Sequence, residues 1–460
     1  MRSARLAATL FVALGLLGLI ATAQAQTAVK PEQREEKAGW IIVHLNGTPK
    51  EIGFQHGSLL SAEIVDALKV VGESVKRGTG KEWNWFRLTA HRLFWNKLTP
   101  ELQEEIKAIS DGAKSKGAAV EADDILALNG HIEIEGYYLP LANGKLTAGR
   151  VVSRAPMACS AFVATGSYTK DNKVVMGHNF WWDYASGQRF RVIMDVKPTK
   201  GHQFMMDTMP GLIHSATDFA INDAGMMMTE TTISGFVGFD ETGIPEFARI
   251  RNAMQFADSI DEFCRIMETG NNGGYANTWL IADSKTSENG KLELGLKSVH
   301  LERTKDGAYG GANFPESKSI LANECKGYNA LADPSCPIRR KRWTQLFAEH
   351  KGSIDSDLAR KFLADTTHPT TGKVGARVST LCGRADLDPL AGNSPSGAIN
   401  AKVVTSAMVK EMRFDAKFGF PDNSTLNAKT YLETYPQFSV LKPYLRDFVA
   451  NPWLTVAARK

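Results

Sequence analysis

Cys159 is the residue of this sequence best placed to do covalent chemistry. It follows a short lead-in, residues 153–158, and opens a run that alternates small and apolar residues as a strand does. A cysteine that begins a strand directly after a loop suggests a chain that cuts itself between Ala158 and Cys159. The new α-amino group would then lie beside the thiol, so one residue would supply both nucleophile and base. The alternative is a buried cysteine in a hairpin.

Such a cut would have a chemical benefit, because it builds a base next to the nucleophile. An internal cysteine thiol has a pKa of about 8.5 and carries little thiolate at neutral pH. A freed α-amine has a pKa of about 7.7–8.0 and can accept the thiol proton without special tuning. Attack of the Cys159 thiol on the Ala158 carbonyl would perform the cut.

Two strands joined by a turn must position Cys159. Ser160–Gly166 reads as the first strand, Lys170–Asn172 has hairpin-turn chemistry, and the return strand starts at Val174. The segment before Cys159 is mainly helical, beginning with a capping box at Thr48–Glu51. Further strands are predicted at Phe190–Val196, His202–Asp207, Gly225–Thr232, Tyr275–Ala282 and Leu292–Leu296, and helices at Pro245–Ala257, Ile260–Glu268, Arg339–His350 and Ser356–Ala364. Strands around helix pairs predict an α+β fold, a layered α/β/β/α sandwich.

Three blocks of the sequence, in order, resemble one known family. CSAFVATGSYTKDNKVVMGHNFWWDY resembles the nucleophile hairpin of the phospholipase B-like proteins. MPGLIHSATDFAINDAGMMMTETTISGF and RIRNAMQFADSIDEFCRIMETGNNGGYANTWLIADSKT resemble that family's next two blocks. The similarity spans roughly Gly47 to Asp388. The family belongs to the N-terminal-nucleophile hydrolases and is related to penicillin acyltransferase-type cysteine enzymes, so the resemblance implies a four-layer α/β/β/α sandwich with a cysteine nucleophile.

The resemblance also transfers site residues to this chain, since asparagine, threonine and histidine can donate to an oxyanion and tryptophan can form an acyl-pocket wall. Besides Cys159, the catalytic and substrate-binding residues it implies are His178, Asn179, Trp181, Thr231 and Asn277. It also implies an arginine from the C-terminal half, for which Arg339 is favoured over Arg340 and Arg342, and one of Trp181 and Trp182 is expected to be structural. The register between Thr231 and Thr232 stays open, and Asn277 could be a turn residue. Asn179 stands where the family has Asp. Asp183 could substitute for that carboxylate or could cap a turn.

The first 25 residues have the character of an export signal. Arg2 and Arg5 precede an apolar core, Leu6–Ile20, and Ala23–Ala25 forms a small-residue cleavage site. Removal of this segment lowers the formal net charge from +4 to +2, because it contains two arginines and no acids. A nearly neutral chain gives no reason to expect a nucleic-acid partner. We expect a periplasmic or secreted protein without a stable membrane anchor; an uncleaved anchor is the alternative.

The cysteine count is odd, which leaves one thiol unpaired if two bridges form. Cys159 is the candidate for that thiol, Cys325 and Cys336 could be bridged across their loop, and Cys264 fits a helix face as a small apolar residue. The ten histidines are scattered, and neither Cys-x-x-Cys nor His-Glu-x-x-His occurs, so no metal or other cofactor is expected. His56 is expected to be a packed helix residue rather than a catalytic one.

We therefore expect an exported cysteine hydrolase that activates itself before Cys159 and cleaves acyl ester bonds of phospholipids or other lipids. The alternatives are an amidase or acyltransferase on N-acyl amides, a non-catalytic binding protein of the same fold, and a structural protein of the envelope. Residues 26–158 and 159–460 would belong to one globular unit and stay associated after the cut. The segment Thr380–Pro389 has no assigned role.

Overall fold

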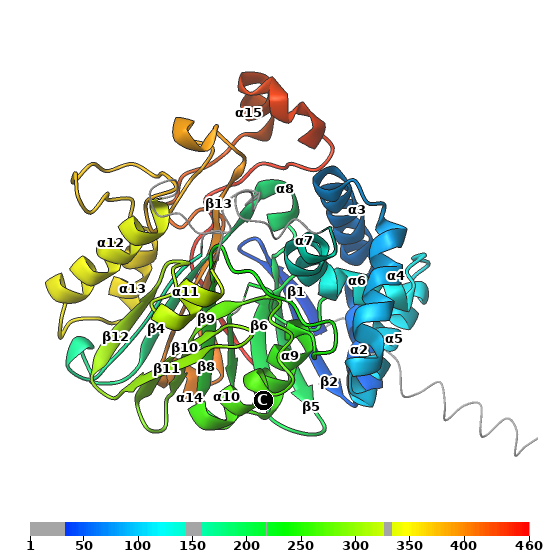
Figure 1. Cartoon of the computed structure of the whole chain (residues 1–460), viewed down its shortest axis with the longest axis horizontal. Coiled ribbons are helices and arrows are strands. Elements are labelled where there is room, and N and C mark those ends of the chain that lie inside the picture. Colours follow the sequence, from blue (N-terminus) through cyan, green and yellow to red (C-terminus); the bar gives the residue numbers. More distant parts are fainter. Residues whose placement is uncertain (1–32, 144–158, 218, 326–333, 460) are drawn as a thin grey trace, which may run out of the picture.

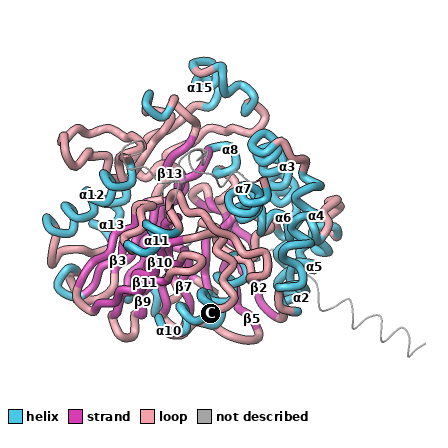
Figure 2. The backbone as a smooth tube through the Cα atoms, viewed as in Figure 1, coloured by secondary structure: helices cyan, strands magenta, loops and turns pink. Residues whose placement is uncertain are grey.

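Two β-sheets lie face to face in the computed structural model, with helices on both outer sides (Figure 1). The structure describes residues 33–143, 159–217, 219–325 and 334–459. The backbone tube coloured by secondary structure shows the strands in the middle and helices on either side of them (Figure 2). The predicted α/β/β/α sandwich is therefore confirmed.

The larger sheet has nine strands in the order β1-β2-β5-β6-β7-β8-β9-β10-β11. Neighbouring strands in this sheet run antiparallel, with the exception of β2 and β5. These two form a parallel ladder from Ile41 opposite Val192 to Gly47 opposite Pro198. The strands are β1 (Arg34–Lys37), β2 (Trp40–Gly47), β5 (Val192–Pro198), β6 (Phe204–Thr208), β7 (Phe219–Asn222), β8 (Met226–Thr232), β9 (Asn277–Asp283), β10 (Glu288–Leu294) and β11 (Val299–Thr304).

The smaller sheet has six antiparallel strands in the order β12-β3-β4-β13-β14-β15. They are β12 (Gly307–Gly311), β3 (Ser160–Thr165), β4 (Val175–Asp183), β13 (Ser396–Thr405), β14 (Arg413–Phe418) and β15 (Leu454–Ala457). A buried apolar layer joins the two sheets, with Ala161, Val163 and Met176 from the smaller sheet against Met227 and Leu280 from the larger. Alternate residues of each strand therefore face the other sheet.

Helices cover the outer face of each sheet (Figure 1). The N-terminal helices and the pair α9 and α10 share one apolar cluster with the outer face of the larger sheet. α12 and α13 bury Trp343, Phe347 and Phe362 against Phe162 of β3. The helices are α2 (Pro49–Leu59), α3 (Ser61–Thr79), α4 (Trp83–Phe94), α5 (Pro100–Lys114), α6 (Ala122–Glu133), the π-helical turn η3 (Ile134–Tyr138), α7 (Leu139–Ala142), α8 (Tyr184–Gly187), α9 (Glu246–Phe256), α10 (Ile260–Glu268), α11 (Lys318–Asn323), α12 (Ser335–Glu349), α13 (Ser356–Leu363), α14 (Ser406–Lys410) and α15 (Ala428–Thr434). Short 3₁₀ turns are η2 (Trp95–Lys97), η4 (Gly166–Tyr168), η5 (Pro389–Ala391) and η6 (Pro436–Leu441).

Glycines allow α2 and α5 to touch through their backbones. A Cβ added at Gly57 would lie 1.9 Å from the Ile109 carbonyl oxygen, and one added at Gly112 would lie 2.2 Å from the Phe54 carbonyl oxygen. The capping box at Thr48 starts α2 as predicted. His56 on the same helix accepts a hydrogen bond from the Gly211 backbone, and burial lowers the pKa of its imidazole to about 3. His56 is thus a packed helix residue, as expected.

The predicted elements around Cys159 are confirmed: β3, β4, β5, β6, β8, β9 and β10 and helices α9, α10, α12 and α13 all form. The helical segment that begins after Thr48 is divided at Leu60 into α2 and α3. β1 and β2 lie in the segment predicted to be mainly helical.

Some expectations fall on residues outside the described ranges, namely the export signal at residues 1–25 and the proposed cut after Ala158. In the described part of the chain, no helix combines the length and apolar character needed to cross a membrane. No disulfide joins any of the five cysteines, all of which are described, so the bridge between Cys325 and Cys336 is not formed.

Candidate active site

Cys159 lies immediately before β3, at the end of the smaller sheet, and is 2% exposed. In the β3–β4 ladder Ser160 lies opposite Asn179 and Ala161 opposite His178. Strand alternation gives the Cys159 side chain the direction of Ala161, toward the larger sheet. Cys159 belongs to the buried apolar cluster that the larger sheet shares with the N-terminal helices, together with Phe180 of β4.

Arg339 reaches the nucleophile strand from α12. Its guanidinium donates to the Cys159 carbonyl oxygen at 2.6 Å and to the Ser160 hydroxyl at 3.2 Å. The other terminal nitrogen donates to the Ala312 carbonyl at 3.1 Å and to Asn313 Oδ1 at 3.2 Å. Arg339 is fully buried, so these bonds fix the start of β3 in an environment without competing water.

A line of hydrogen bonds continues from Arg339 to the larger sheet. The Asn313 amide nitrogen donates to the Thr232 carbonyl at 2.9 Å. The Thr232 hydroxyl donates to the Tyr275 hydroxyl at 2.7 Å, and that hydroxyl lies 3.4 Å from Glu230 Oε1. The end of β8 is thereby tied to the carbonyl of Cys159 although the two are about seventy residues apart in the sequence.

Asn277 is the first residue of β9 and lies opposite Thr232. When its amide is oriented to satisfy its surroundings, the nitrogen donates to the Ala276 carbonyl at 3.0 Å and to Glu230 Oε2 at 2.7 Å, and the oxygen faces only donors. The Tyr137 hydroxyl, from the π-helical turn η3, accepts from the Ala276 backbone N–H at 3.2 Å. Asn277 is thus joined to the Cys159 carbonyl through β8 and Arg339.

His178 faces the layer between the sheets. Both ring nitrogens are buried with no hydrogen-bond partner among the described residues. Burial, and then the nearby Lys402 ammonium, hold the pKa of this imidazole well below its usual range. Lys402 lies opposite His178 on β13 and forms a buried ion pair with Asp207 of β6 at 3.0 Å. His178 is therefore neutral at physiological pH.

Asn179 and Trp181 point to the other face of the smaller sheet. The Asn179 amide nitrogen donates to the Leu363 and Leu381 carbonyls at 2.7 and 3.1 Å. The Trp181 ring lies 5.3 Å from the Arg339 guanidinium and against Gly383, where a Cβ would clash. The segment Thr380–Pro389 thus packs on the outer side of the strands that carry Cys159 and Trp181.

Thr231 and Asp183 have different surroundings. Thr231 points between the sheets toward Gly311 of β12, and its hydroxyl has no partner among the described residues. Asp183 caps α8 by accepting from the Ser186 backbone N–H at 2.9 Å, which fits the capping alternative. Arg340 is half-exposed beside Glu316, and Arg342 pairs with Asp365.

Sequence reasoning missed several polar residues that join these groups, namely Ser160, Glu230, Tyr275, Asn313 and Lys402 with Asp207. Glu230 had a usable signal, since strand alternation in ETT separates residues 230 and 232 from Thr231. No sequence signal pointed to Asn313, because only the tertiary fold brings its loop to Arg339.

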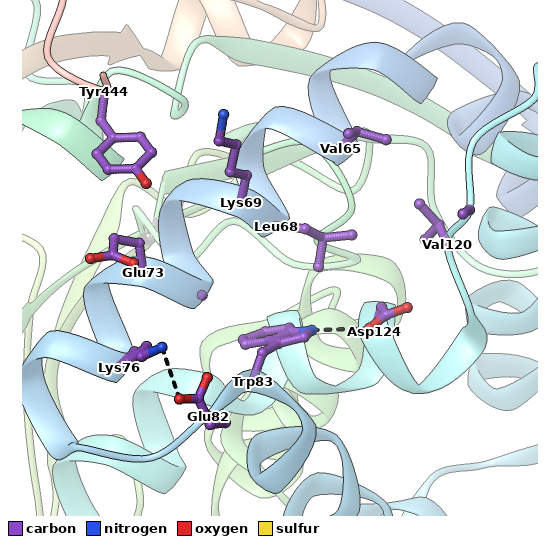
Figure 3. A pocket seen from close by; sticks show the side chains of 12 residues that line it. Val65, Leu68, Lys69, Glu73, Lys76, Glu82, Trp83, Val120, Asp124 and Tyr444 are labelled. Atoms are coloured by element: carbon purple, nitrogen blue, oxygen red, sulfur yellow. Dashed lines mark hydrogen bonds and ion pairs between the residues drawn. The ribbon is translucent and has the colours of Figure 1, made fainter. Parts of the chain in front are cut away.

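The surface hollows lie away from Cys159. One hollow of about 450 Å³ is lined by α3, α4 and the segment before α6, together with Tyr444 (Figure 3). Two pairs of its polar groups are joined, Lys76 with Glu82 at 2.8 Å and the Trp83 indole with Asp124 at 2.9 Å. A second hollow lies between Arg34 and Ala118. None of the predicted site residues lines either hollow.

Comparison with known families identifies the group of proteins to which this chain is related. Residues 71–323, more than half of the chain, match the sequence model of the phospholipase B family. The chain belongs to the phospholipase B family. The matched residues include Cys159, β8 with Glu230 and Thr231, and the start of β9 at Asn277, so the predicted resemblance is confirmed.

Individual relatives within this family are distant. An uncharacterized protein of Archaeoglobus fulgidus is 26% identical over 361 residues, which cover 72% of this chain and 58% of the relative. A phospholipase B of Crotalus adamanteus is 24% identical over 278 residues, 54% of this chain and 49% of the relative. The chain thus spans about half the length of these relatives. The solved penicillin V acylase from Agrobacterium tumefaciens is 12% identical, with a TM-score of 0.34 over 56% of this chain and 83% of the acylase.

Proposed function

We propose that this protein is an exported cysteine hydrolase that cuts itself before Cys159 and cleaves acyl ester bonds of phospholipids or other lipids. The observation that carries the proposal is the buried Arg339, which binds the carbonyl of Cys159 and the hydroxyl of Ser160. A fixed carbonyl holds the nucleophile residue in one orientation at the start of β3. Membership of the phospholipase B family supports acyl substrates.

Three of the other four thiols are poor nucleophiles, which favours Cys159. Burial raises the pKa of Cys264 and of Cys325 to about 12, so both thiols stay protonated at neutral pH. Burial also raises the pKa of Cys382 far above its usual value. Thiols of this kind are structural rather than reactive.

In the proposed mechanism the freed α-amine of Cys159 takes the thiol proton, and the sulfur attacks the acyl carbonyl of the substrate. The tetrahedral intermediate collapses to an acyl-enzyme as the amine returns the proton to the leaving alcohol. A water molecule, deprotonated by the same amine, then releases the fatty acid and restores the thiol. His178 and Thr231, which face the layer between the sheets, would line the site beside Cys159, while Asn179, Trp181 and Asp183 would support it from the outer side.

Intact mass and acyl-enzyme trapping test the proposal. Scaling 50.3 kDa over 460 residues, residues 26–158 and 159–460 should give fragments of about 15 and about 33 kDa. Cys159→Ala should abolish cutting and turnover. Cys159→Ser should cut slowly and be a poor catalyst, because an alcohol is a weaker nucleophile than a thiol.

Three outcomes would redirect the proposal. An uncut wild-type chain that hydrolyses acyl substrates would refute the amine as base. Turnover of acyl amides alone would change the substrate class to that of an amidase and keep Cys159 as nucleophile. An uncut and inert chain would favour a binding protein of the same fold.

N-terminal sequencing of the exported chain tests cleavage after Ala25.

A further inference from the structure

We infer that two neighbouring loops, residues 370–377 and 387–392, form a surface that docks this protein on a phospholipid bilayer with anionic headgroups. These are called the docking loops below. The inference deepens the proposed function, on which it rests, because it names the physical state of the substrate as lipid in a membrane rather than dispersed lipid. It also gives a role to the segment Thr380–Pro389, which leads from one loop into the other.

The docking loops expose large apolar side chains at their tips. Leu390 is 96% exposed, Val374 is 78% exposed and Leu387 is 51% exposed. A Cβ built on Gly372 or Gly392 would meet no described atom within 4 Å, so the chain around both tips is open to solvent. Single exposed apolar residues are common on protein surfaces, but a group of them marks a site of contact with another molecule.

The charges around these tips are cationic. Lys373 and Arg377 are the exposed charged side chains of residues 366–395, all of which the structure describes. The two acids of this segment, Asp386 and Asp388, are only 3% and 2% exposed. Apolar side chains beside lysine and arginine suit a membrane surface, since the former enter the boundary of the acyl chains while the latter meet anionic headgroups.

The buried Asp388 carboxylate holds the two loops together. Its Oδ1 accepts a hydrogen bond from the Leu390 backbone N–H at 3.0 Å, and its Oδ2 accepts one from the Val378 backbone N–H at 3.3 Å. The Arg377 guanidinium lies 3.8 Å from the same carboxylate. Both loops are therefore fixed before any partner is bound, which lowers the conformational entropy that binding costs.

The segment between the loops packs close to the candidate active site. The Ala398 backbone N–H of β13 donates to the Gly383 carbonyl at 2.9 Å, and the Trp181 ring packs against Gly383. Trp181 lies 5.3 Å from the Arg339 guanidinium, which donates to the Cys159 carbonyl. In Figure 1 the gold and orange loops between α13 and β13 lie at the upper left, above α12. Docking through them would bring this end of the smaller sheet toward the membrane.

Projecting tips fit a bilayer better than a folded partner. A specific protein–protein interface buries about 800 Å² on each partner and requires a complementary surface. Apolar side chains at loop tips enter a fluid interface without such a surface, because lipids rearrange around them. A few apolar side chains with two nearby cations predict weak, reversible binding that salt weakens.

Flotation with vesicles of ether-linked phospholipids tests the inference, because these lipids have no acyl ester to hydrolyse. The mature wild-type chain should float with vesicles of phosphatidylcholine and phosphatidylglycerol, and less so in high salt. Leu390→Asp should weaken binding about 10-fold or more, since it removes an inserted apolar side chain and adds a charge of the same sign as the headgroups. Lys373→Gln should weaken binding about 5-fold, and only where phosphatidylglycerol is present.

The matched control is Leu88→Asp, which alters a leucine that is 64% exposed on α4, in the helical layer over the larger sheet. It should bind vesicles as the wild type does. A wild-type chain that does not float would overturn the inference, as would equal binding by Leu390→Asp and Leu88→Asp. A wild-type dimer that Leu390→Asp abolishes, without vesicle binding, would overturn it in favour of a protein contact.

Hydrolysis assays separate this inference from the proposed function. Leu390→Asp should keep the kcat/KM of the wild type on a soluble short-chain ester and lose about 10-fold on vesicles of ester-linked phospholipid. Equal losses on both substrates would overturn the docking role. If the wild type floats with vesicles but hydrolyses no ester, the proposed function fails and the docking surface stands.

Discussion

Replacing Arg339 should destabilise the protein far more than replacing its neighbour Arg340 on the same helix. Arg339 is fully buried and donates to five acceptors, including the carbonyls of Cys159 and Ala312. Arg340 is half-exposed and forms one ion pair with Glu316 at 3.2 Å. The two substitutions to methionine therefore compare a buried guanidinium with a surface one at the same place in the fold.

The expected magnitude follows from these contacts. Each buried acceptor left unsatisfied costs about 1–3 kcal/mol, so two backbone carbonyls give a loss of about 4 kcal/mol for Arg339→Met. An exposed ion pair is worth about 0–1 kcal/mol, which bounds the loss for Arg340→Met. With an unfolding entropy of about 2.1 cal/mol/K per residue, 460 residues give a fall in Tm of about 4 °C for Arg339→Met and about 1 °C or less for Arg340→Met.

Differential scanning calorimetry of the wild type and both variants, at one scan rate, measures these shifts. Circular dichroism of each variant at 20 °C checks that it is folded before heating. Equal melting temperatures for Arg339→Met and Arg340→Met would refute the reasoning, because they would mean that the buried carbonyls find other donors or never depended on Arg339.

Two further predictions concern the N-terminal helices. Gly57→Ala should lower the free energy of unfolding by about 2–3 kcal/mol, because its Cβ would lie 1.9 Å from the Ile109 carbonyl oxygen; urea denaturation measures this, and Gly136→Ala, where a Cβ meets nothing within 4 Å, is the control. Burial raises the pKa of the Glu133 carboxyl to about 7, against the hydrogen bond from Asn272 and the charge of Arg249. The folded state thus binds this proton more tightly than the unfolded state, so protonation of Glu133 adds to the free energy of unfolding. This contribution is fully present below pH 4.5, and about 3 kcal/mol of it is lost as the pH rises through about 7. Subtracting the Tm profile of Glu133→Gln from that of the wild type should give a difference that falls by about 3 °C over this range; a flat difference would contradict the raised pKa.

Local patterns predicted the elements that carry the candidate site, because their signals are contained in short stretches. The capping box at Thr48 and the period-two runs of β3 and β8 needed no tertiary information. β1 and β2 were missed, since a strand inside a helical segment gains its partner from β5, about 150 residues away.

The sequence identified candidate site residues by their type, but it did not predict the face of the sheet to which each side chain points. Arg339 was chosen among three arginines of one helix, and the structure brings it to the carbonyl of Cys159. Asn179 and Trp181 face the opposite side of the sheet from Ala161. Glu230 is adjacent in sequence to a predicted residue, but its partner Asn277 is fixed only by the register between β8 and β9.

The parallel ladder between β2 and β5 has a consequence for the order of events in maturation. β2 precedes the proposed cut and β5 follows it, so a cut before Cys159 would leave one sheet built from two polypeptides that share backbone hydrogen bonds. Among its described residues the smaller piece carries β1 and β2, and its departure would expose the backbone edge of β5. Assembly of the sheet would therefore have to come first and scission second, and separately produced pieces would have to find each other by a slow bimolecular encounter.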